Sequence, residues 1–235
     1  LPSKGLIYPP ENPLSKGVLE MKYMTAKEED ILTNGSYIKN GTVIDKLLKS
    51  LIVTPIDYND IVMGDKNAIM IAARVLGYGK DYTFTLEDIE HTVDLTEVKD
   101  KELKEEYLLS KGQNEFEFMF PTIQKSVTFK ILTHGDEKKI DNEVKGIKKA
   151  KKGESPEYST RLKHMILSVD GDTERKTIRE FVDTQLLARD ARALRTYIKE
   201  IQPDVDLVFG LETEEGEKEV RIPIGITFFW PDSEL

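Results

Sequence analysis

The sequence contains no cysteine among its 235 residues. Disulfide bonds and thiol catalysis are therefore excluded, and a zinc site would have to be built from histidine and carboxylate side chains alone. Only three histidines are present, His91, His134 and His164, and their spacing matches no common metal-ligand pattern. We therefore expect neither a metal ion nor another cofactor in this protein.

Long apolar runs are also missing. A bilayer-spanning helix needs about 20 apolar residues in succession, whereas even the longest apolar runs here are short, such as residues 69–73. The start of the sequence lacks the charged and apolar regions of a secretory signal peptide. We therefore expect no membrane partner and no signal peptide, and a length that suits one large domain or two small ones.

Basic residues are outnumbered: 34 Lys and Arg stand against 43 Asp and Glu, which gives a net charge of −9. Nucleic acid is therefore a disfavoured partner, because neutralisation of phosphates supplies most of the affinity for it. Residues 138–152 are a local exception, with seven lysines. We interpret this segment as a solvated helix face and keep a phosphate-binding patch as the less favoured alternative.

Familiar catalytic motifs are absent as well. The sequence has no P-loop, no dinucleotide-binding glycine motif, no nucleophile elbow and no zinc-protease motif. Residues 77–79 (Gly-Tyr-Gly) follow a predicted helix and so indicate its end. Residues 170–172 (Asp-Gly-Asp) begin like a calcium loop, but the twelfth position is Phe181 where such a loop needs Glu. We therefore predict that the protein is not an enzyme and has no catalytic residues; an enzyme acting on cell wall or nucleotide is the least favoured alternative.

The apolar pattern predicts an α+β fold, in which helical segments alternate with small antiparallel β-hairpin sheets. Thr25 and Glu28 form a capping box for a helix that ends near residue 32. Thr42 is expected to begin a second helix and Asp65 a third. Further helices are predicted over residues 136–152, 156–169 and 174–201.

Strict alternation of apolar and polar residues predicts the strands. Residues 82–86, 93–95, 115–120 and 127–131 are expected to form one compact antiparallel sheet within residues 82–132. A last hairpin joins residues 207–211 to 220–226 around an acidic tip. Residues 25–132 and 133–235 each pass from helices to a hairpin, so we treat them as two domains and suspect an internal duplication.

Residues 1–24 form a predicted arm with four prolines, which exclude a helix and favour an extended chain. The arm is apolar, and fully burying one large apolar side chain contributes roughly 1.5–3 kcal/mol. We therefore expect it to be ordered and to pack along another subunit or across its own domain. Its candidate interface residues are Leu6, Ile7, Tyr8 and Leu14.

Phe228, Phe229 and Trp230 concentrate three aromatic side chains near the end of the sequence. The favoured interpretation is a C-terminal strand buried in the core. The alternative is an exposed anchor for a partner, since exposed aromatic side chains often mark interfaces. All three are therefore kept as candidate interface residues.

Short segments in a fixed order carry a family resemblance that spans nearly the whole chain. They are residues 1–5 (LPSKG), 8–9 (YP), 24–33 (MTAKEEDILT), 40–48 (NGTVIDKLL), 64–69 (GDKNAI), 74 (R), 78–79 (YG), 222–225 (IPIG) and 228–231 (FFWP). In this order they resemble the baseplate protein family of T-even-type contractile-tailed bacteriophages. None of these segments is a catalytic motif.

The resemblance implies a structural or assembly role in the baseplate hub or the tail-tube initiation complex. The implied partners are other baseplate or hub subunits, with the tape-measure protein and a second copy of the chain as further candidates. The implied location is the virion, after assembly in the host cytoplasm. The alternative is a transient tail-assembly chaperone, in which the amphipathic helices at 156–169 and 174–201 form a groove for helices of the tape-measure protein.

Some members of this family carry CxxC pairs in two hairpin regions. The corresponding positions here hold Leu86, Glu87 and Asp88 in the first region and Leu211, Glu212 and Thr213 in the second. The resemblance therefore implies no metal site for this chain.

Overall fold

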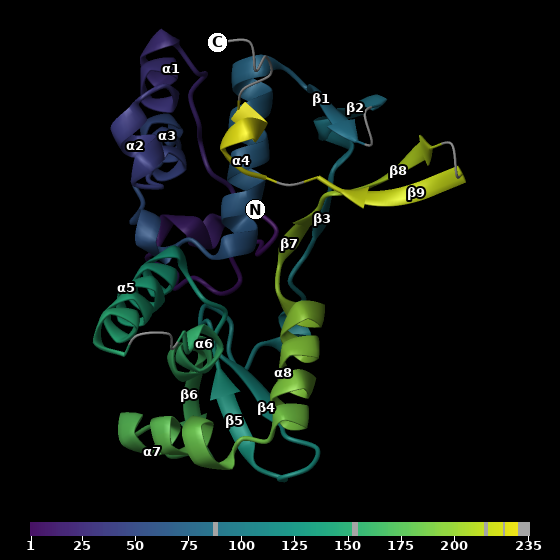
Figure 1. Cartoon of the computed structure of the whole chain (residues 1–235). Coiled ribbons are helices and arrows are strands. Elements are labelled where there is room, and N and C mark those ends of the chain that lie inside the picture. The colour runs from purple at the N-terminus through teal and green to yellow at the C-terminus, as the bar shows by residue number, and fades with distance from the viewer. Residues whose placement is uncertain (87–88, 152–154, 214–215, 223, 230–235) are drawn as a thin grey trace.

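The computed structural model describes residues 1–86, 89–151, 155–213, 216–222 and 224–229. Helices alternate with small antiparallel sheets, so the predicted α+β class is confirmed (Figure 1). None of the helices in the described part of the chain has the length and apolar character needed to cross a membrane.

The helices near the N-terminus follow the sequence signals closely. Helices α1 (Ala26–Leu32), α2 (Gly35–Lys39) and α3 (Val43–Leu51) lie together beside the longer α4 (Met63–Tyr78) (Figure 1). The predicted capping box is present, with the Thr25 hydroxyl 2.6 Å from the Glu28 carboxylate. Asp65, however, does not begin α4: the helix starts two residues earlier, and the Asp65 side chain is buried.

Two of the predicted hairpins are confirmed. Strand β1 (Asp81–Leu86) pairs with β2 (Ile89–Asp94), with Tyr82 opposite Val93. Strand β4 (Phe116–Met119) pairs with β5 (Ser126–Phe129), with Phe116 opposite Phe129. The expected single sheet is wrong, because the two hairpins belong to separate sheets.

A third strand, β6 (Ile166–Val169), pairs with β5 where the sequence predicts the end of a helix. Helix α6 (Glu157–Met165) ends directly before β6 begins. Across strands β5 and β6, the Ser168 hydroxyl lies 2.8 Å from the Thr128 hydroxyl. In the same way, β3 (Lys99–Lys101) pairs with β7 (Asp204–Asp206). Both pairings cross the expected boundary between residues 132 and 133, so strands of the two predicted segments share sheets.

The remaining elements complete the chain. They are α5 (His134–Ala150), α7 (Arg175–Glu180), a π-helical turn (Phe181–Gln185), α8 (Ala188–Ile201), β8 (Val208–Thr213) and β9 (Gly216–Arg221), with short 3-10 helices at Pro13–Lys16, Tyr58–Asp60, Leu95–Glu97, Glu105–Tyr107 and Ile226–Phe229. Strands β8 and β9 form the predicted last hairpin. Helices α5 to α8 surround the β4–β5–β6 sheet at the end of the molecule away from α1–α3 (Figure 1).

The N-terminal arm is not extended over residues 1–17, where the prediction is wrong. These residues form tight turns and one 3-10 helix. Gly5 and Gly17 have φ angles of +77° and +70°, and a Cβ atom on Gly5 would lie 2.2 Å from the carbonyl oxygen of Ser15. The chain is extended only afterwards, where Met21 forms a bridge with Ile52. Glycine thus lets the arm fold back on itself.

Candidate functional site

Asp65 fastens the arm to α4. Its Oδ1 accepts a hydrogen bond from the Ser3 backbone N–H at 2.9 Å, and its Oδ2 accepts bonds from the Ser3 hydroxyl at 2.6 Å and the Tyr8 hydroxyl at 2.7 Å. Burial raises the pKa of Asp65, although these hydrogen bonds act in the opposite direction. The arm is therefore part of the core of this chain.

This packing corrects the predicted interface residues of the arm. Ile7, Tyr8 and Leu14 are at most 5% exposed and Leu6 is half-buried, so of the two expected positions the arm takes the one on its own chain, and these candidate interface residues pack into the core. The physical reason is that the buried Asp65 carboxylate accepts hydrogen bonds from Ser3 and Tyr8, which holds the arm against the core. The sequence shows that these side chains need burial, but not which surface buries them.

The described C-terminal aromatic residues also lie in the core, which contradicts the alternative in which they form an exposed anchor. Phe228 and Phe229 are fully buried, and the Phe228 ring lies 4.9 Å from that of Tyr82, measured between centroids. They belong to a 3-10 helix that contacts α4, not to the expected strand. Trp230 lies outside the described residues. Phe228 and Phe229 are therefore core residues, as the favoured interpretation expected.

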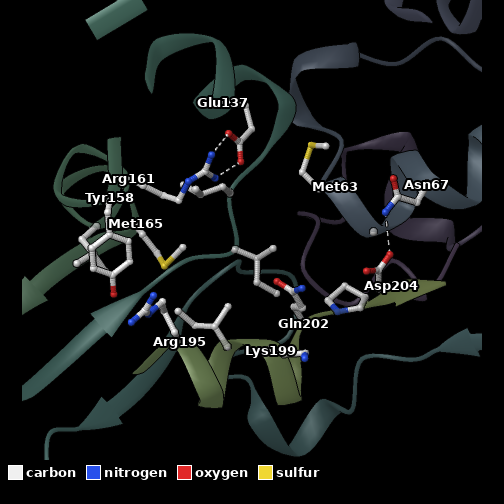
Figure 2. Close-up of a pocket in the computed structure, with 16 residues that line it drawn as sticks. Met63, Asn67, Glu137, Tyr158, Arg161, Met165, Arg195, Lys199, Gln202 and Asp204 are labelled. Carbon is white, nitrogen blue, oxygen red and sulfur yellow. Dashed lines mark hydrogen bonds and ion pairs between the residues drawn. The ribbon is translucent and has the colours of Figure 1, made fainter. Parts of the chain in front are cut away.

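A cavity of about 440 Å³ opens between the N-terminal end of α4 and helices α5, α6 and α8 (Figure 2). We call it the central groove. Its lining residues are Met63, Gly64, Asn67, Ile131, Leu132, Glu137, Tyr158, Arg161, Leu162, Met165, Arg195, Ile198, Lys199, Gln202, Pro203 and Asp204. None of the predicted interface residues lies in it.

Gly64 explains why α4 reaches this groove. A Cβ atom at this position would lie 1.9 Å from the carbonyl oxygen of Pro203, so only glycine allows the helix to approach residues 203–204 so closely. Asn67, one turn later, donates a hydrogen bond of 2.9 Å to Asp204 Oδ1. The contact brings Met63 to the wall opposite α6 (Figure 2).

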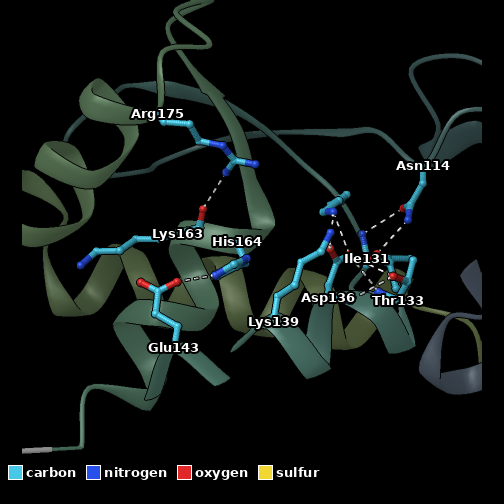
Figure 3. Close-up of polar contacts among 10 residues, drawn as sticks. Asn114, Ile131, Thr133, Asp136, Lys139, Glu143, Lys163, His164 and Arg175 are labelled. Atoms are coloured by element: carbon cyan, nitrogen blue, oxygen red, sulfur yellow. Dashed lines mark hydrogen bonds and ion pairs between the residues drawn. The ribbon is translucent and has the colours of Figure 1, made fainter. Parts of the chain in front are cut away.

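Polar contacts around the groove hold its lining segments in place (Figure 3). Asn114 exchanges two hydrogen bonds with the backbone of Ile131, of 2.8 and 2.9 Å, and so fixes the floor. His164 of α6 lies 2.8 Å from the Glu143 carboxylate of α5, which joins these two helices. Within the described chain, no group of three or more His, Asp or Glu side chains is placed to hold a metal ion.

Each acidic side chain in the lining of the groove forms an ion pair with an arginine. Arg161 binds Glu137 through two contacts of 2.5 and 2.8 Å, and Asp204 lies 3.6 Å from Arg221. Two basic groups remain on α8. Arg195 stacks over the Tyr158 ring at 4.5 Å from its centroid, and Lys199 lies one turn further on; neither forms an ion pair with any described acidic residue. The groove therefore presents an unbalanced positive edge.

Sequence reasoning suggested a groove between the helices predicted at residues 156–169 and 174–201, but it named none of the residues that line this cavity. The amphipathic patterns of α6 and α8 were visible, and Arg195 and Lys199 stand at the four-residue spacing that places two side chains on one helix face. The contribution of α4 was not visible, because it depends on a contact between residues that are far apart in the sequence.

A comparison of the chain with protein-family models, with curated proteins and with solved structures finds no match.

Proposed function

We propose that this chain is a structural or assembly component of a contractile phage tail, in the baseplate hub or the tail-tube initiation complex. It acts through protein–protein surfaces, with other baseplate or hub subunits as partners. The proposal rests on the ordered segments that resemble the baseplate protein family. It places the chain in the virion, after assembly in the host cytoplasm.

The observation that most supports this proposal is where the resembling segments lie. Ser3 and Tyr8 of the first segments bond to Asp65 of the segment at 64–69. Glu28, in the segment at 24–33, accepts a hydrogen bond of 2.7 Å from Ser50, at the end of α3. The segments thus fall on residues that build one packed unit around α4.

Quantitative mass spectrometry of purified tails tests the proposal. Peptides of this chain at a fixed ratio to known tail subunits would establish a structural component. Peptides found in assembly intermediates but absent from finished tails would establish an assembly factor. Absence from both, in infected cells that contain the protein, would refute the proposal.

A transient chaperone for the tape-measure protein is the second candidate. The central groove favours it, because α6 and α8, which line two of its walls, could receive partner helices. Co-expression with the tape-measure protein should then increase the soluble yield of that protein. An unchanged yield would count against the chaperone role and leave the structural role standing.

A further inference from the structure

We infer that the central groove binds an acidic amphipathic helix of a partner protein. This inference deepens the proposed function and rests on it only in assuming that the chain works by binding other proteins. It assigns the chemistry of the bound segment: apolar side chains on one helix face, flanked by Asp or Glu residues.

The apolar part of the groove can receive large side chains. Ile131, Leu162, Met165 and Ile198 form the apolar base of the groove but are at most 9% exposed, whereas Met63 stands at the lip with 36% of its surface exposed. Tyr158 is 39% exposed. Methionine, tyrosine and arginine are enriched at protein interfaces, and flexible methionine side chains adapt to the shape of a bound helix.

The charges select the sign of the partner. Glu137 and Asp204 are already matched by Arg161 and Arg221, whereas Arg195 and Lys199 have no described acidic partner. The described lining thus holds three basic and two acidic side chains, a positive balance in a chain whose net charge is −9. Complementary potentials favour an acidic segment and disfavour a basic one, because like charges placed together cost free energy.

The shape of the walls favours a helix over a strand. Most lining residues belong to α4, α5, α6 and α8, and Asp204 is the one described lining residue in a strand. That strand, β7, already pairs with β3 on one side and contacts α4. A bound strand would lack a free edge, whereas the side-chain ridges of a helix can pack between those of α6 and α8.

Two designed peptides of about 20 residues test the inference, since this length allows stable helices. Both carry leucine at the same helical positions; one has glutamate and the other lysine at the flanking positions. Methyl-labelled methionine provides the signal, because Met63 and Met165 line the groove while Met119 does not. We expect the glutamate peptide to shift the Met63 and Met165 signals, to leave Met119 unchanged, and to bind about tenfold more tightly than the lysine peptide.

Charge reversal on α8 provides the matched comparison. Arg195→Glu with Lys199→Glu should weaken binding of the glutamate peptide about tenfold. Arg189→Glu with Arg192→Glu changes the same helix by the same charge outside the groove and should leave binding unchanged. Circular dichroism confirms that both variants fold.

Equal affinity for both peptides, or no shift at Met63 and Met165, would overturn the inference. An equal effect of the two charge reversals would also overturn it, as would shifts on dilution of the free protein that show a second copy of the chain in the groove. These outcomes are separate from the tail role. A protein absent from tails that still binds the glutamate peptide would refute the proposed function alone, and a stoichiometric tail protein that ignores the peptide would refute this inference alone.

Discussion

Gly64 of α4 packs directly against the backbone of Pro203, so closely that a Cβ atom would lie 1.9 Å from the Pro203 carbonyl oxygen. Gly64→Ala should therefore separate α4 from the segment that follows α8. We expect a loss of about 1–3 kcal/mol in the free energy of unfolding, as for other overpacked sites. Denaturant titration measures this loss.

Gly146, one turn before the end of α5, provides the control because a Cβ atom there would meet nothing within 4 Å. Gly146→Ala should stabilise the protein by about 0.5–1 kcal/mol through the better helix propensity of alanine. If both variants change the free energy of unfolding equally, the close contact with Pro203 is not the reason that position 64 requires glycine.

Tyr8→Phe tests the bond between the arm and Asp65. The substitution removes one hydroxyl, which donates to Asp65 Oδ2 at 2.7 Å and accepts a bond of 3.2 Å from the Val62 N–H. Because both partners are buried, we expect a loss of about 1–3 kcal/mol. Tyr23→Phe should be nearly neutral, since Tyr23 is 72% exposed. Equal stability of the two variants, measured by thermal unfolding, would contradict a structural role for the Tyr8 hydroxyl.

Removal of residues 1–17 tests the whole arm. Since Ile7, Tyr8 and Leu14 belong to the core and Ser3 satisfies Asp65, the truncated chain should lose its cooperative unfolding transition. Circular dichroism during heating would detect this change. A truncated protein that folds normally but fails to assemble would instead return the arm to the interface role that the sequence suggests.

Glu28 should make the stability depend on pH. Hydrogen bonds from Lys22, Thr25 and Ser50 hold the pKa of the buried Glu28 carboxyl far below its usual range. A carboxyl group with a lowered pKa in the folded state stabilises the protein above its unfolded pKa, about 4.3. This contribution is lost as the pH falls below that value. Glu28→Gln should therefore destabilise the protein at neutral pH and reduce the loss of stability below about pH 4.

Glu29→Gln is the control for this prediction, because Glu29 is the exposed neighbour in the same helix. Its unfolding free energy should follow that of the unmodified protein across the acidic range. If Glu28→Gln shows the same acid slope as the unmodified protein, another carboxyl group must cause the slope.

Local patterns predicted the parts of the fold that depend on local forces. The capping box at Thr25 and Glu28 fixes the start of α1, and the alternation around Phe116 and Phe129 fixes the β4–β5 hairpin. Strand β6 was missed because a short apolar run suits either a helix end or a strand. Its pairing with β5, about 40 residues away in the sequence, decides between them.

The candidate site was less predictable than the fold. An acidic residue near a helix start can cap that helix or bind another segment, and only the position of the arm shows that Asp65 does the second. Apolar residues such as Ile7 and Phe228 require burial, but composition does not distinguish the chain's own core from that of a partner. The groove arises where α4 meets the end of α8, which no local pattern records.

The pairing of β3 with β7 also constrains when the protein can fold during synthesis. Residues 99–101 can pair only after residues 204–206 have been synthesised, and Asn67 of α4 can bond to Asp204 only then. Contacts between such distant segments form slowly, because a long loop must close before they contribute stability. While the ribosome is still adding the second half, the face of α4 that carries Gly64 and Asn67 lacks its contact with residues 203–204. We therefore expect the nascent chain to need protection from aggregation until α8 and β7 have left the ribosome.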